Sequence, residues 1–164
     1  AANELKNKYS NISFNVVGKL GVDNKTSIDK KLLDDYINRK IINYLGEAEN
    51  MKDILTQHDI VVLPSYREGM SRLLLEAASM QRPIITTDVP GCKEIVKDSF
   101  NGFLCQPRDY KDLANKIEKM INISEGERIK FGNNGRNFII ENFDIPKVLA
   151  VRSIGASDCF LTIK

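Results

Sequence analysis

The sequence contains no tryptophan, one histidine and three cysteines among 164 residues. Cys92, Cys105 and Cys159 form no Cys-x-x-Cys pair, so neither a zinc site nor a redox dithiol is indicated. Their odd number and wide spacing predict reduced thiols in a cytoplasmic protein. No Asp-x-Asp motif and no group of histidines offers ligands for a divalent cation. We therefore expect no metal and no cofactor.

Neither charge nor hydrophobicity is concentrated in one stretch. Lysine and arginine total 24 and aspartate and glutamate total 22, which leaves a net charge of +2. A basic stripe with interleaved aromatic residues is missing, so nucleic acid is not an expected partner. No apolar run approaches the ~20 residues of a membrane-spanning helix. The length suits one domain, 1–164, with a sizeable core.

Short apolar runs alternate with segments of helical character along the chain. Strands are expected at residues 12–17, 41–45, 60–63, 83–86 and 102–105, and helices at 1–9, 30–38, 51–57, 71–80, 93–96, 110–121 and 124–142. This alternation predicts an α/β protein with a Rossmann-like three-layer α/β/α arrangement and a mostly parallel sheet. Ser124 and Glu127 fit a capping box, whereas Gly132 and Gly135 interrupt the pattern of the last helix. Residues 151–164 fit no expected element.

The most informative segment is residues 65–76, Ser-Tyr-Arg-Glu-Gly-Met-Ser-Arg-Leu-Leu-Leu-Glu. It follows an apolar run that ends at Pro64, and it opens into a predicted helix. A helix that starts after a strand offers unpaired N–H groups and a partial positive charge to phosphate. Gly69 allows the backbone to approach a ligand closely. Two carboxylates, Glu68 and Glu76, flank the segment with seven residues between them.

Glu76 is the unusual residue of the predicted helix, because its neighbours are apolar on almost every side. These neighbours are Leu73, Leu74, Leu75, Ala77, Ala78 and Met80. A carboxylate in such a place needs a polar partner. A sugar diol is one candidate, and a nearby backbone N–H or lysine is an equally good alternative.

Together these residues resemble a known family. Glu-x7-Glu after a strand ending in Pro-Ser resembles the signature of retaining glycosyltransferases with the GT-B fold, in the glycogen-synthase-like superfamily also called glycosyl transferases group 1. Glu-Gly-Met-Ser-Arg, followed by Thr-Thr-Asp-Val-Pro-Gly-Cys-Lys-Glu-Ile-Val, resembles bacterial members that build capsule, O-antigen or lipid-linked oligosaccharides. The resemblance runs from about residue 11 to about residue 144 and is most specific over residues 61–102.

The resemblance implies that this chain is the carboxy-terminal, donor-nucleotide-binding half of a GT-B fold. The acceptor-binding half and a first strand would then lie outside the chain, and the chain alone would transfer no sugar. The implied partners are a nucleotide-sugar, with a UDP-sugar as the preferred class, and a glycan or lipid-linked acceptor bound through the missing domain. The full-length enzyme would be peripheral to the inner face of the cytoplasmic membrane.

The resemblance also implies roles for the residues of the informative segment. Glu76 would accept hydrogen bonds from the ribose hydroxyls, and Glu68 would face the donor sugar as the catalytic carboxylate. The backbone around Gly69, Met70 and Ser71 would meet the diphosphate. For Ser71 a plain helix N-cap is an equal alternative.

Other candidate contacts lie nearby. Arg72 would pair with phosphate or, as the slightly preferred alternative, be a solvated first-turn side chain. In the family the loop before residues 51–57 holds the base, so Asn50 and Met51 are candidates there, although an N-cap and simple packing explain them better. Glu94 is expected in the first turn of the predicted helix at 93–96, where it would complement the helix dipole.

Two alternatives to a glycosyltransferase remain. A sugar-nucleotide epimerase of related architecture needs acid and base residues at the sugar, and the sequence offers only His58, which is expected at a helix end or on the surface. A non-catalytic nucleotide-binding interaction module is the other alternative, and the pair of Glu68 and Glu76 argues against it.

Overall fold

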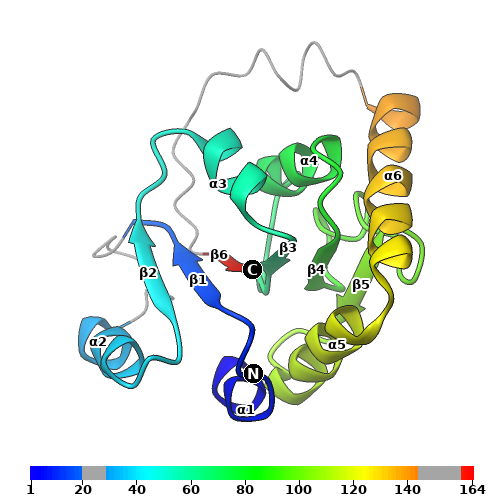
Figure 1. The fold of residues 1–164 in the computed structure, drawn as a ribbon. Helices are drawn as coiled ribbons and strands as arrows, with labels where there is room; N and C mark the ends of the chain where they lie inside the picture. Colours follow the sequence, from blue (N-terminus) through cyan, green and yellow to red (C-terminus); the bar gives the residue numbers. More distant parts are fainter. Residues whose placement is uncertain (20–28, 144–159) are drawn as a thin grey trace.

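The computed structural model describes residues 1–19, 29–143 and 160–164, and these build a six-stranded sheet between two layers of helices (Figure 1). The strands are β1 (Phe14–Val17), β2 (Asn43–Gly46), β3 (Ile60–Leu63), β4 (Ile84–Thr87), β5 (Gly102–Cys105) and β6 (Phe160–Ile163). Their order is β2-β1-β6-β3-β4-β5. β1 pairs in parallel with β2, and β4 pairs in parallel with both β3 and β5, whereas β6 is antiparallel to both β1 and β3. The expected mostly parallel sheet is confirmed.

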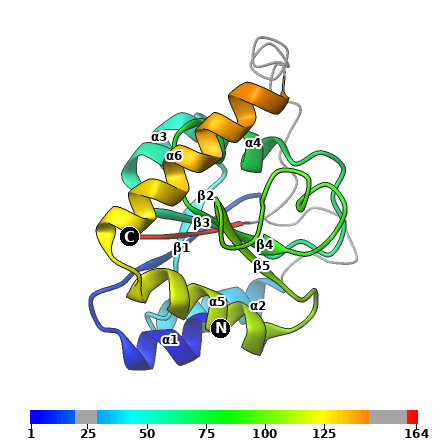
Figure 2. The same cartoon turned by 90° about the vertical axis from the view of Figure 1, so that its right-hand side faces the viewer.

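In the described part of the chain, helices cover both faces of the sheet (Figures 1 and 2). One layer holds α1 (Ala2–Lys8), α2 (Lys30–Asn38) and α5 (Tyr110–Asn122), and the other holds α3 (Met51–Gln57), α4 (Arg72–Ser79) and α6 (Glu125–Asn142). Each layer has its own apolar core, because residues alternate between the two faces along each strand. Leu55, Leu74 and Ile139 pack on the α4 side, and Leu5 and Ile117 pack on the α5 side.

The helices start where side chains cap them. Asp29, Asn50 and Asp109 each accept a hydrogen bond from a backbone N–H in the first turn of the helix that follows. The predicted capping box is confirmed, because Ser124 and Glu127 exchange their side-chain and backbone bonds at the start of α6. No helix in the described ranges is long and apolar enough to cross a membrane.

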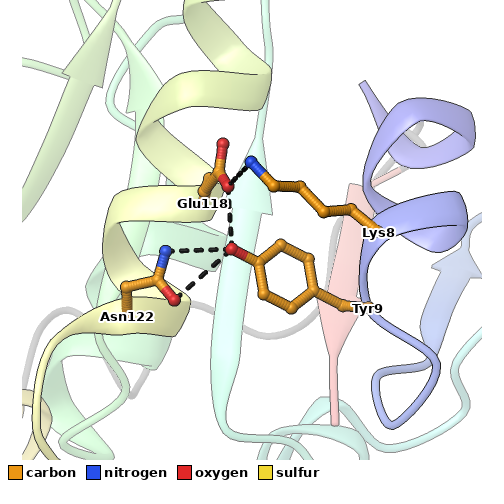
Figure 3. Close-up of polar contacts among 4 residues, drawn as sticks. All are labelled: Lys8, Tyr9, Glu118 and Asn122. Atoms are coloured by element: carbon orange, nitrogen blue, oxygen red, sulfur yellow. Dashed lines mark hydrogen bonds and ion pairs between the residues drawn. The ribbon is translucent and has the colours of Figure 1, made fainter.

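Helix α1 is held against α5 by a small polar cluster (Figure 3). The Tyr9 hydroxyl donates to Glu118 Oε1 at 2.7 Å and accepts from Asn122 Nδ2 at 3.0 Å. Lys8 forms an ion pair with the same Glu118 carboxylate. Bonds from Lys8 and Tyr9 hold the pKa of the Glu118 carboxyl below its usual value. The cluster fixes α1 to the layer that covers this face of the sheet.

Two expectations fail. Residues 93–96 form turns and no helix: the N–H groups of Ile95 and Val96 both donate to the Cys92 carbonyl, and the Asn101 side chain then takes the next N–H, that of Lys97. Glu94 therefore faces no helix dipole, and its carboxylate instead accepts from the N–H of Gly91 at 2.6 Å. The second difference is β6, a strand within residues 151–164, where none is expected.

Candidate functional site

The sheet has one position where its strand order reverses. From β1 the chain moves outward to β2, and β3 then begins the other half of the sheet. In open α/β sheets, ligands bind outside the carboxyl ends of the strands at such a switch point. The loop of residues 64–71 leaves the carboxyl end of β3 there and leads into α4. The structure thus places the informative segment at the position where this architecture binds ligands.

The start of α4 keeps its backbone donors available. Ser71 occupies the N-cap position and is only 5% exposed, but its hydroxyl makes no capping hydrogen bond. Its N–H is 3.4 Å from the Gly91 carbonyl oxygen. Since the side chain does not cap the helix, the first turn of α4 retains N–H groups and positive partial charge for an anion.

Glu76 finds its polar partner one turn earlier on the same helix. The Arg72 Nε donates to Glu76 Oε1 at 2.7 Å, and the Glu76 side chain is 18% exposed. The partner is therefore neither a backbone N–H nor a lysine, and Arg72 is not simply solvated. A carboxylate accepts about four hydrogen bonds, so this pair leaves Glu76 room for further donors.

Arg72 also has a donor to spare. Its Nη1 atom is shielded from solvent and has no hydrogen-bond acceptor among the residues that the structure describes. An unsatisfied buried N–H costs free energy comparable to a lost hydrogen bond. The guanidinium is thus held by Glu76 and still has one nitrogen ready for an acceptor at the start of α4.

A second loop lies directly against the Glu68–Gly69 backbone. Gly91 adopts φ +87°, and a Cβ atom at this position would lie 1.6 Å from the Gly69 carbonyl oxygen and 2.7 Å from that of Glu68. Only glycine permits this contact between the two backbones. The sequence does not indicate this role of Gly91, because the approach involves residues more than twenty positions apart.

Two threonines of β4 hold the start of the loop of residues 64–71, which carries Glu68. Thr86 Oγ1 donates to the Leu63 carbonyl at 2.8 Å, and Thr87 Oγ1 donates to the Ser65 carbonyl. Nearby Cys92 is fully buried, and burial raises the pKa of its thiol, with the Glu68 carboxylate adding to the rise. Cys92 is thus a neutral packing residue, and the loop that carries Glu68 is anchored on both sides.

The remaining candidates separate into exposed and packed residues. Gly69 and Met70 are exposed, with Met70 at 57%. Asn50 caps α3 by accepting from the N–H of Lys52 at 3.1 Å, and Met51 packs on the apolar core beside α4. The N-cap and packing expected for these two residues are confirmed. The described residues contain no group of three His, Cys, Asp or Glu side chains that could hold a metal ion.

Comparisons with known proteins agree with this architecture. Over 150 residues the chain is 31% identical to the capsular polysaccharide biosynthesis glycosyltransferase CapM of Staphylococcus aureus, covering 85% of this chain and 36% of CapM. It is 33% identical over 114 residues to an Escherichia coli UDP-Gal:alpha-D-GlcNAc-diphosphoundecaprenol alpha-1,3-galactosyltransferase, covering 66% of this chain and 28% of that enzyme. The chain thus spans about a third of the length of these relatives.

Solved structures show the same fold. A variant of S. aureus TarM in complex with UDP superposes with a TM-score of 0.77 at 25% identity, covering 90% of this chain and 29% of TarM. The carboxy-terminal domain of the Francisella tularensis group 1 glycosyl transferase LpcC superposes with a TM-score of 0.61 at 28% identity, covering 71% of this chain and 63% of that domain. The family model of glycosyl transferases group 1 matches residues 1–138, and the chain belongs to this family.

Proposed function

We propose that this chain is the donor-binding domain of a retaining glycosyltransferase that takes its sugar from a nucleotide-sugar, with UDP as the preferred nucleotide. The observation that carries the proposal is the Arg72–Glu76 pair at the start of α4, at the switch point of the sheet. The capsule and lipid-linked glycan relatives support a glycan or lipid-linked acceptor, held by parts of the enzyme beyond this domain.

In this proposal each group has one task. The first N–H groups of α4 and the unused Nη1 of Arg72 bind the diphosphate, and the remaining acceptor capacity of Glu76 binds the ribose hydroxyls. Glu68, fixed by the loop contacts to Gly91, orients the donor sugar at the reacting carbon. The leaving diphosphate gains negative charge as the bond breaks, and fixed donors at that point lower the barrier. The loop before α3 lies near the base.

The alternative of an epimerase loses support from the position of the histidine. His58 lies between α3 and β3, at the amino end of β3. The loop that carries Glu68 leaves the opposite, carboxyl end of the same strand. His58 is buried, and its Nδ1 lies 2.6 Å from the Ile54 carbonyl oxygen. The sequence holds no other histidine. An epimerase would have to find its acid and base elsewhere.

Replacing Glu76 by alanine tests the proposal. We expect UDP affinity, measured by calorimetry, to fall about 10- to 100-fold, because charge-assisted bonds to the ribose are lost. Asp35→Ala is the matched control, since Asp35 pairs with Arg39 at the same i,i+4 spacing on α2, where both side chains are about half exposed. That variant should bind UDP like the unaltered chain. Equal affinity in the Glu76 and Asp35 variants would remove the ribose role, and no binding of UDP or GDP by the unaltered chain would reject the proposed function.

Metal removal provides an independent test. Arg72 and the α4 amides supply the positive charge in this proposal, so UDP titrations with and without EDTA should give the same dissociation constant. A large loss of affinity on chelation that Mg²⁺ or Mn²⁺ restores would contradict this expectation.

A further inference from the structure

The central strand of the sheet runs against its neighbours. β6 lies between β1 and β3, and Thr162 pairs with Asn15 on one side and Val61 on the other. Flanking bonds extend both ladders: the N–H of Ser13 donates to the Lys164 carbonyl at 2.8 Å, and the N–H of Asp59 donates to the Ile163 carbonyl at 2.9 Å. The other five strands described are mutually parallel, so β6 alone reverses direction.

Without β6, the strand order is that of a doubly wound sheet from which one strand is missing. The remaining order is β2-β1, a gap, and β3-β4-β5. Doubly wound sheets have the order 3-2-1-4-5-6, with all strands parallel. The five parallel strands fill positions 3, 2, 4, 5 and 6 of that plan. β6 therefore occupies position 1, which this architecture gives to a strand parallel to β1 and β3.

Helix α1 lies on the face of the sheet where a connection from a parallel strand at position 1 to β1 would place it. Parallel crossovers are right-handed, so steps in the same direction along the sheet place their helices on the same face. The step from β1 to β2 uses α2. A step from position 1 to β1 goes in the same direction, and α1 does lie on the α2 face (Figures 1 and 2). The bonds from Lys8 and Tyr9 to Glu118 hold it there.

The residues of β6 suit position 1 only in part. Interior strands of parallel sheets are near-continuous apolar runs, as in the Ile-Val-Val-Leu of β3. β4 and β6 each bury a threonine completely, but Thr86 of β4 donates to the Leu63 carbonyl at 2.8 Å, whereas the Thr162 hydroxyl of β6 reaches only the Asn15 carbonyl, at 3.4 Å. Residues 160–163 also lie outside the part of the chain that matches the family model.

We propose that the position between β1 and β3 is an exchangeable strand site. β6 fills it in this chain, and an apolar strand that runs parallel to β1 and β3 displaces β6. The N–H and C=O groups of β1 and β3 supply the main-chain bonds, and the two cores accept apolar side chains on both faces of the incoming strand. The partner is thus defined by an uncharged apolar run of about four to six residues and by its direction.

Strand capture by a variant with a weakened β6 tests this site. Leu161→Pro disturbs β6, because proline cannot donate to a ladder and is not accommodated in a central strand. The probe is the peptide Lys-Lys-Ile-Val-Val-Leu-Lys-Lys with a photo-crosslinker at its amino end, and the control peptide carries proline at the second valine. We expect saturable binding of the first peptide only, at least about tenfold tighter to the variant than to the unaltered chain.

The site of crosslinking reports the direction of the bound peptide. A parallel strand places the crosslinker near Ser13 and Asp59, at the amino ends of β1 and β3, as mass spectrometry of the crosslinked fragments would show. Crosslinks near Gly18 and Pro64, or no binding to a folded variant, would overturn the proposal.

Hydrogen exchange of the unaltered chain gives a second test that needs no variant. If β6 leaves its site while the rest stays folded, the amides of Leu161–Ile163 exchange at least about tenfold faster, after correction for intrinsic rates, than the amides of Ile85 and Thr86 in β4, which does not touch β6. Equal protection of the two strands would mean that β6 opens only with the whole domain, and the exchangeable site would be rejected.

Discussion

Replacing Gly91 by alanine is expected to lower UDP affinity by at least about tenfold and to destabilise the domain by roughly 2–4 kcal/mol. The new Cβ would lie 1.6 Å from the Gly69 carbonyl oxygen, so the two backbones must separate. Separation displaces Glu68 and breaks the contact between the Ser71 N–H and the Gly91 carbonyl. Calorimetric UDP titration and thermal unfolding of the same preparation measure both effects.

Gly46→Ala is the control for this experiment. Gly46 has φ +82°, close to that of Gly91, but nothing lies within 4 Å of a Cβ placed there. Alanine at position 46 therefore adds backbone strain of about 1–2 kcal/mol without a collision. Because Gly46 directly precedes the loop that we place near the base, this control compares stability alone, and Gly46→Ala should lose less stability than Gly91→Ala. If the two variants lose the same stability, the contact between the loops has no special role.

Gly132→Ala is expected to destabilise the domain by about 1–3 kcal/mol, seen as a Tm lower by about 2–12 °C. Its Cβ would lie 2.1 Å from the Gln81 carbonyl oxygen, in the turn that ends α4. Arg136, one helical turn later, donates to the Ser79 carbonyl at 2.7 Å, so α6 has little freedom to move away. Thermal or denaturant unfolding measures the loss.

Two other glycines of α6 serve as controls for Gly132. A Cβ at Gly126 meets nothing within 4 Å, and one at Gly135 meets Ala78 at an ordinary 3.6 Å. Alanine at either position should leave stability unchanged or raise it by up to about 1 kcal/mol, since alanine favours helix over glycine. A loss at Gly126 equal to that at Gly132 would show that helix propensity, and not the contact with Gln81, determines the result.

The order and type of most elements could be predicted from the sequence. The five expected strands are present, because short runs rich in apolar residues are local signals, although β1 begins at Phe14 and not at residue 12, and β2 begins at Asn43 and not at residue 41. The prediction of a helix at residues 93–96 was wrong, because Gly91 and the Asn101 side chain redirect the backbone on either side of a single turn. β6 was missed although Phe-Leu-Thr-Ile is a similar short run, because its partners β1 and β3 are distant in sequence and its antiparallel place between them has no local signal.

The candidate site was predictable in its location but not in its contacts. The strand, loop and helix around Glu68 and Glu76 were visible in the sequence, and the need of Glu76 for a polar partner was correctly inferred. The sequence did not identify Arg72 as this partner, because their contact depends on the rotamers that the Arg72 and Glu76 side chains adopt along α4. Gly132 interrupts the helical pattern of the sequence, yet α6 is continuous and this glycine lets α6 pack closely against the end of α4.

The central position of β6 has a consequence during protein synthesis. Asn15 and Thr162, which pair in neighbouring strands, are separated by 147 positions. At about 5–20 residues per second, a ribosome needs roughly 7–30 s to cover this distance. From the synthesis of β3 until that of β6, both β1 and β3 lack the pairing that β6 gives them in the folded chain. Unpaired strand edges recruit other chains, so this interval is when chaperones have the most effect on the yield of folded protein.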